Sequence, residues 1–98
     1  MAGFDAGGLD EVIHGRMRLG IMAYLAQTEP AGFTELAQVL GATNGNLSVH
    51  LTRLERAGYV ALTKGTQGRR PHTEVALTAE GRRAWAAYLA TMRALFPD

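Results

Sequence analysis

Cysteine is absent from this chain. Its absence excludes disulfides, thiolate zinc sites, thiol redox sensors and cysteine nucleophiles. Long apolar runs are absent too: no stretch approaches the roughly 20 residues that span a bilayer, and the sequence does not begin with a basic segment followed by an apolar run. We therefore expect a cytoplasmic protein that does not enter the membrane.

Charged residues are scarce, at 19% of the chain, whereas 47% of the residues are apolar. A chain of 98 residues forms one domain with one core, and it is too short for a core plus a deep enclosed active site. With so few charges, apolar surface remains exposed on a domain of this size. The composition therefore favours a homodimer in which a helix of each protomer covers the excess.

Constellations that perform chemistry are missing as well. No Ser/His/Asp order, pair of catalytic carboxylates or phosphate-cradling glycine loop can be assembled, and residues 65–68 are interpreted as a turn. A metal site would require His14, His50 and His72 to converge from distant elements without a carboxylate cluster. We therefore predict no enzyme activity, no catalytic residue, no metal and no cofactor.

The net charge of +1 hides an uneven distribution. Residues 5–42 carry a net charge of −3, residues 43–72 carry +4, and the remaining residues sum to zero. Positive charge concentrated on one surface attracts a polyanion. The alternative interpretation is that these charged residues form an ordinary surface that contacts only solvent and binds no polyanion.

Apolar periodicity, capping residues and turn signals predict the order helix, helix, helix, strand, strand, helix. The helices are expected at residues 9–27, 34–40, 43–57 and 79–96, and the strands at 59–64 and 73–77. Hydroxyls of Thr34, Thr43 and Thr78 are placed to cap helices, while Gly41 and Gly58 are placed to end them. Residues 1–8 are predicted to form a flexible tail, residues 65–71 a hairpin loop, and residues 9–98 one compact unit.

The most informative segment is the helix expected at residues 43–57. Leu47, Leu51 and Leu54 follow the i, i+4, i+7 spacing of one apolar stripe, so the opposite side of the helix is free to face a partner. Two short helices joined by a tight turn containing glycine form a helix-turn-helix. One face of this helix is therefore expected to anchor it, and the other to recognise something.

The last helix carries a wide apolar stripe. We interpret it, with the first helix, as a dimer interface, the alternative being an effector pocket. The predicted interface residues are Leu9, Val12, Ile13, Trp85, Tyr88, Leu89, Met92, Leu95 and Phe96.

These motifs, in this order, resemble the winged helix-turn-helix domains of bacterial and archaeal transcription regulators. The resemblance is to the MarR-like and ArsR-like groups, and most closely to small single-domain winged helix regulators, and it covers nearly all of the chain after Gly8. It implies an α+β, mainly α fold with a three-helix core, a two-stranded β-wing and a C-terminal dimerisation helix. The segments that carry it are residues 18–22, 33–37, 46–51, 54–60 and 77–82.

The resemblance implies a sequence-specific regulator that binds double-stranded DNA as a homodimeric repressor, nucleoid-associated when bound. The expected recognition helix would enter the major groove, where amides, hydroxyls and methyl groups match base edges. Its candidate DNA-binding residues are Thr43, Asn44, Asn46, Ser48, Val49, Thr52 and Arg53, and those of the wing, on the DNA backbone or in the minor groove, are Lys64, Arg69, Arg70 and His72. The alternative is a winged helix that serves protein interaction or assembly without reading DNA.

Several residues keep two interpretations. Asn44 and Asn46 are also typical of caps and turns, and a charged hairpin tip also serves solubility. His50 is expected to pack against the domain with a backbone partner in preference to contacting a base. Arg16 and Arg18 either reach phosphates or pair with Asp10, Glu11 or a partner protomer. The sequence leaves open whether a small-molecule effector binds.

Overall fold

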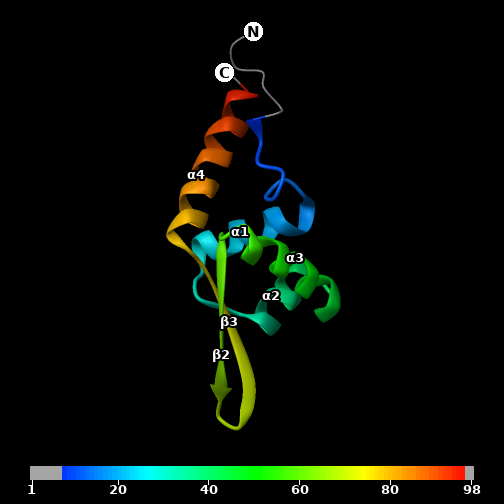
Figure 1. Ribbon diagram of the computed structural model, residues 1–98. Helices are drawn as coiled ribbons and strands as arrows, with labels where there is room; N and C mark the ends of the chain where they lie inside the picture. Colours follow the sequence, from blue (N-terminus) through cyan, green and yellow to red (C-terminus); the bar gives the residue numbers. More distant parts are fainter. Residues whose placement is uncertain (1–7, 97–98) are drawn as a thin grey trace.

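The computed structural model describes residues 8–96, so nearly all of the predicted N-terminal tail and the last two residues of the chain lie outside the described residues. Within residues 8–96, four helices and three strands follow in the predicted order, with one short strand added between the first two helices (Figure 1). They are α1 (Arg16–Gln27), β1 (Ala31–Gly32), α2 (Phe33–Leu40), α3 (Asn44–Arg56), β2 (Val60–Gln67), β3 (Arg70–Leu77) and α4 (Ala79–Ala94).

The sheet is antiparallel with strand order β1-β3-β2. Strands β2 and β3 pair along their full length, from Val60 opposite Leu77 to Gln67 opposite Arg70. Only Gly68 and Arg69 connect them; the positive φ of Gly68, 66°, at the first central position is typical of a type II′ turn. The predicted loop at residues 65–71 is therefore wrong, because the strands continue almost to the tip.

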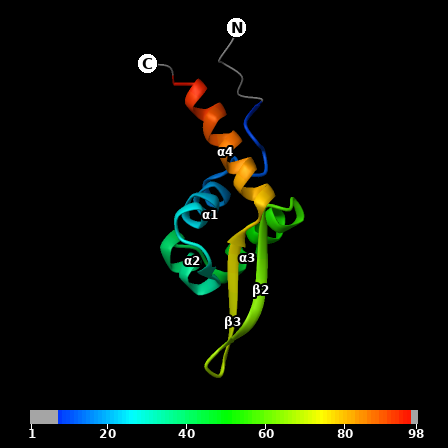
Figure 2. The same cartoon turned by 90° about the vertical axis from the view of Figure 1, so that its left-hand side faces the viewer.

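The molecule is elongated, with extents of 56 × 25 × 23 Å. In Figures 1 and 2 the β2–β3 hairpin projects from the body formed by α1, α2 and α3, and α4 extends in the opposite direction. The tip of the hairpin and the last turn of α4 thus lie at opposite ends of the molecule.

One core joins the three short helices to the base of the sheet. Leu47, Leu51 and Leu54 are almost completely buried, as the apolar stripe of α3 predicts. Apolar side chains from α1, α2 and the strands surround them: Ile21, Met22, Leu25, Ala31, Leu36, Ala37, Val60, Val75 and Leu77.

The first helix starts at Arg16 and not near residue 9. The Asp10 carboxylate accepts hydrogen bonds from the backbone N–H groups of Val12 (2.8 Å) and Ile13 (3.4 Å), and so holds a turn there. Aspartate favours such local turns over a continuous helix. The apolar spacing of residues 9–15 is real, but these residues pack in a non-helical segment, with Ile13 fully buried.

The capping predictions hold for two of three threonines. The hydroxyls of Thr43 and Thr78 accept hydrogen bonds from the N–H groups of Asn46 (3.1 Å) and Gly81 (2.9 Å). Thr34 instead lies inside α2, which begins at Phe33. The start of α2 is stabilised by the Glu35 carboxylate, which accepts the Gly32 N–H at 3.2 Å.

Tyr59 ties the end of α3 to the N-terminal segment. Its hydroxyl donates to the Asp10 carboxylate at 2.5 Å, and this bond, with burial and nearby negative charge, raises the pKa of Tyr59 to about 12. Since the folded pKa lies above the unfolded value of about 10, the stabilisation is complete below pH 10 and is lost as the pH rises through about 12.

We expect Tyr59→Phe to lower the free energy of unfolding by about 1 kcal/mol at neutral pH, because it removes this hydrogen bond. Urea denaturation at neutral pH and at several pH values above 10 measures the difference between the two proteins. The difference should shrink as the pH rises, because the wild-type phenol ionises. A difference that stays constant up to pH about 12 would contradict this assignment.

Candidate nucleic-acid interface

Helix α3 presents a long exposed surface above a buried stripe. Thr43 caps the first turn of the helix. Beyond the last turn the chain changes direction at Gly58, whose φ of 85° favours glycine. All seven of the predicted recognition residues are exposed, and Val49 keeps 67% of its surface accessible. An apolar side chain this exposed in the middle of a helix is available for contact with a partner.

A groove of about 700 Å³ separates α3 from the hairpin. From α3 it is lined by Ser48, Thr52 and Glu55, and from the hairpin by Lys64 and neighbouring residues. The structure therefore brings two predicted recognition residues and one predicted hairpin residue to one groove. Glu55 was not predicted there; it lies seven residues after Ser48, close to two helical turns along the same side.

A second hollow, of about 450 Å³, lies on the outer side of α3. Val49, Thr52, Arg53 and Arg56 line it at the i, i+3, i+4, i+7 spacing of one helix face. Arg56 was not among the predicted residues, although its spacing from Val49 marks it. The outer face thus combines an exposed methyl-bearing side chain with two guanidinium groups.

The basic residues of the hairpin are divided between its faces. Directly paired residues share a face and successive residues alternate, so Lys64, paired with Thr73, faces α3, whereas Arg70, paired with Gln67, lies on the opposite face. His72, paired with Gly65, is also on that opposite face. Arg69 occupies the tip, and Lys64, Arg69 and Arg70 are all exposed.

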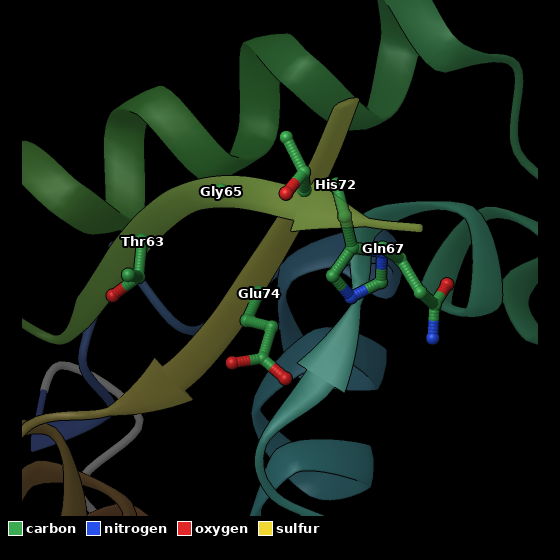
Figure 3. Close-up of a pocket in the computed structure, with 6 residues that line it drawn as sticks. Thr63, Gly65, Gln67, His72 and Glu74 are labelled. Carbon is green, nitrogen blue, oxygen red and sulfur yellow. The ribbon is translucent and has the colours of Figure 1, made fainter. Parts of the chain in front are cut away.

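Figure 3 shows the face of the hairpin on which His72 lies. A hollow of about 220 Å³ there is lined by Thr63, Gly65, Thr66, Gln67, His72 and Glu74. The His72 ring is half-buried against β1, since a Cβ on Gly32 would lie 3.0 Å from its Cε1 atom. The structure therefore separates His72 from Lys64, and places it at the junction with β1 and not at the exposed tip.

His50 is half-buried, but its partner is not a backbone group as predicted. Nη1 of Arg18 lies 3.0 Å from His50 Nδ1, and Nε of Arg18 donates to the carbonyl of Val12 at 2.6 Å. Burial, and then the charges of Arg18 and Arg53, lower the pKa of His50. Arg18 thus links the N-terminal segment to α3, and does not pair with Asp10 or Glu11.

The arrangement of α1, α2 and α3 with the β2–β3 hairpin matches a known family along most of the chain. The family model described as a winged helix DNA-binding domain matches residues 17–96. The chain belongs to this winged helix family. The β2–β3 hairpin corresponds to the predicted wing, and α3 corresponds to the predicted recognition helix.

Two archaeal proteins are similar to this winged helix chain over most of their lengths. An uncharacterized protein of Methanocaldococcus jannaschii is 33% identical over 79 residues, which cover 81% of this chain and 86% of that protein. A transcriptional regulator homologue from Pyrococcus horikoshii OT3, of known structure, is 34% identical, with a TM-score of 0.81 over 88% of this chain and 85% of that one.

Larger regulators share the winged helix fold. The transcriptional repressor CouR, solved with a 23-mer DNA duplex, is 26% identical, with a TM-score of 0.70 over 78% of this chain and 53% of CouR. A MarR-family transcription regulator is 25% identical, with a TM-score of 0.67 over 83% of this chain and 52% of that one. The predicted resemblance to MarR-like winged helix regulators is confirmed, and these neighbours are transcription regulators and not enzymes. The resemblance to the ArsR-like group stays a prediction.

The residues predicted to form the dimer interface fall into two groups in this winged helix domain. Ile13 and Tyr88 are buried within the single chain and keep almost no accessible surface for a partner. Tyr88 stacks on Trp85 at 5.8 Å between ring centroids, its hydroxyl lies 2.8 Å from His14 Nδ1, and burial raises its pKa. The other predicted residues keep accessible surface: Leu9, Val12, Trp85, Leu89, Met92 and Leu95 are half-buried, and Phe96 is 73% exposed.

The three histidines lie in three different surroundings, against Tyr88, Arg18 and Gly32. Within residues 8–96, no three side chains of the metal-ligating types gather closely enough to hold an ion. Over the same residues, none of the helices is long and apolar enough to cross a bilayer.

Proposed function

We propose that this winged helix protein is a sequence-specific regulator of transcription that binds double-stranded DNA as a homodimer. The observation that carries the proposal is the surface of α3: its predicted recognition residues are exposed along one helix whose opposite side is locked into the core. A DNA major groove admits one α-helix presented in this way.

The side chains on α3 suit base edges. Asn44 offers an amide that can pair with adenine, Ser48 and Thr52 are versatile donors and acceptors, and Val49 can contact a thymine methyl group. Arg53 and Arg56 on the outer face suit guanine or phosphate. Ser48 and Thr52 line the groove beside the wing, which gives this side of α3 a second wall.

We propose that the wing contacts the DNA backbone or the adjacent minor groove through Lys64, Arg69 and Arg70. Arginine suits both sites, because its planar donors form paired hydrogen bonds with phosphate and it is weakly hydrated. Arg69 lies in the two-residue turn at the tip of the wing, where it is exposed.

We propose that α4 and residues 9–12 form the dimer interface. Leu89, Met92 and Leu95 expose apolar surface there, and the highly exposed Phe96 extends it toward the end of the helix. Because α4 extends away from the wing, a partner seated on it leaves α3 and the wing free (Figure 2). A symmetric dimer of this kind presents two recognition helices to one operator.

Repression by blocking access of the polymerase is the outcome we propose, in a cytoplasmic protein that is nucleoid-associated when bound. The support is the exposed surface of α3 and the accessible apolar side chains of α4, together with the DNA-bound repressor among the structural neighbours.

Selection of bound fragments from a random pool of duplex DNA tests the proposal. We expect an enriched site with two inverted half-sites whose centres lie about one helical turn apart, since two symmetric recognition helices would enter successive major grooves. Direct half-sites, or a single half-site bound by a monomer in sedimentation, would contradict the dimer. Failure to enrich any sequence would contradict specific recognition.

A further inference from the structure

The side of α3 that faces away from the wing has a polar cluster in which the sequence predicted two DNA-binding residues, Asn46 and Arg53, and one packing residue, His50. Asn46, His50 and Arg53 lie on this side at i, i+4 and i+7, one above the other on the helix. Arg18 of α1 lies behind them, in hydrogen-bond contact with the His50 ring. Arg18 also donates a hydrogen bond to the carbonyl of Val12. The N-terminal segment, α1 and α3 therefore meet at this cluster.

The contact with Arg18 fixes the hydrogen that the His50 ring carries. A guanidinium has only donors, so Nδ1 of His50 must accept. A neutral imidazole that accepts at Nδ1 carries its hydrogen on Nε2. Among residues 8–96 Nε2 has no partner, and no polar side-chain atom in this range is both buried and unpaired. Nε2–H is therefore an oriented donor that faces solvent.

The charge around His50 has one sign. The nearby charges that act on the ring are the guanidinium groups of Arg18 and Arg53, and both are positive. Within the described part of the chain, neither arginine forms an ion pair with a carboxylate. An oriented donor between two unneutralised guanidinium groups matches an anion that carries several acceptor oxygens.

We propose that His50, together with Arg53 and Asn46, binds a phosphate of the DNA backbone on the side of α3 opposite the wing. In this site His50 donates from Nε2, Arg53 supplies charge, and Asn46 donates from its amide. Arg18 is a positioning residue that fixes the ring and does not touch DNA. The duplex would then be held on both sides of the recognition helix, by the wing on one side and by this phosphate site on the other. This inference rests on the proposed DNA-binding function.

Two variants of His50 separate phosphate contact from simple packing. His50→Asn keeps an acceptor near the position of Nδ1 for Arg18 but removes the outward donor. His50→Gln keeps a donor near the position of Nε2 but removes the acceptor. A phosphate contact predicts that Asn is the more harmful replacement, whereas a purely structural link to Arg18 predicts that Gln is.

The measurement is fluorescence anisotropy with a labelled duplex of about three helical turns, over a series of salt concentrations. We expect His50→Asn to bind about tenfold more weakly at every salt concentration, because a lost neutral donor releases no counterion. His50→Gln should stay within about twofold of wild type, and Arg53→Ala should lower the log-log salt slope by about 0.9. Wild-type affinity in His50→Asn, or equal losses in the Asn and Gln variants, would overturn the proposal.

A spectroscopic measurement covers the case in which a variant does not fold. In wild-type protein, the imidazole ¹⁵N spectrum should show Nε2 protonated and Nδ1 unprotonated, and the Nε2 resonance should shift when the duplex is added. A ring whose resonances do not change on DNA binding would overturn the phosphate site. If DNA binding is lost in wing variants while His50→Asn binds normally, this inference fails and the proposed function stands; if wild-type protein binds no duplex, both fail.

Discussion

Replacing Gly81 by alanine is expected to destabilise the domain by about 3 kcal/mol or more, although alanine is the better helix former. Gly81 is buried in the first turns of α4, where the helix crosses the corner between α3 and β2. A Cβ at this position would lie 2.0 Å from the backbone oxygen of Tyr59, a distance that no relaxed contact allows.

The corner that Gly81 contacts cannot easily move. The backbone oxygen of Tyr59 accepts the N–H of Thr78 at 3.0 Å, and the Tyr59 N–H donates to the carbonyl of Leu54 at 3.0 Å. The Thr78 hydroxyl also donates to the carbonyl of Gly58 at 2.5 Å. A methyl group at position 81 must therefore displace either the start of α4 or the end of α3.

Urea denaturation measures the loss, and Gly45→Ala is its matched control. Gly45 also lies in a helix, but it is exposed and a Cβ there meets nothing within 4 Å. This change should leave stability unaltered or raise it by up to about 1 kcal/mol, because alanine has the higher helix propensity. A Gly81→Ala protein as stable as wild type would show that α4 does not approach Tyr59 this closely.

The apolar periodicity predicted α3 well because one side of this helix contacts only the core and the other side is exposed. Leu47, Leu51 and Leu54 all contact the same core, so their spacing alone defines the buried side. Thr43 and Gly58 mark the two ends by local chemistry, a side-chain cap and a positive φ. Local signals of this kind require no knowledge of the rest of the fold.

Three features that the sequence did not reveal depend on contacts between residues far apart in the sequence. Residues 9–15 have helical spacing, yet Asp10 turns the chain and bonds to Tyr59, 49 residues away. Arg18 and His50 are 32 residues apart, so no local pattern identifies the partner of the histidine. The need for glycine at position 81 likewise arises only when α4 crosses Tyr59.

Removing both arginines at the end of the wing, as Arg69→Ala/Arg70→Ala, is expected to weaken DNA binding about 100-fold at moderate salt. Each arginine that contacts a phosphate contributes about 0.9 to the slope of log affinity against log salt, so the slope should fall by about 1.8. Anisotropy titrations of a labelled duplex over a salt series measure both quantities. An unchanged affinity and slope would exclude the wing from the interface.

A control variant removes two positive charges from a part of the molecule that lies outside the proposed interface. Arg83 and Arg93 are exposed on α4, which extends away from the wing, so Arg83→Ala/Arg93→Ala lowers the net charge equally without touching the proposed interface. If this control weakens binding as much as the wing variant does, the general field of the protein and not contact by the wing explains the loss.

Single variants then decide how the wing meets the duplex, because Lys64 and Arg70 lie on opposite faces of the hairpin. A wing that docks with the face toward α3 depends on Lys64 and tolerates Arg70→Ala. A wing whose tip enters the minor groove depends most on Arg69, since this residue stands at the turn. The order of the three losses therefore distinguishes a backbone contact beside the recognition helix from insertion into the neighbouring minor groove.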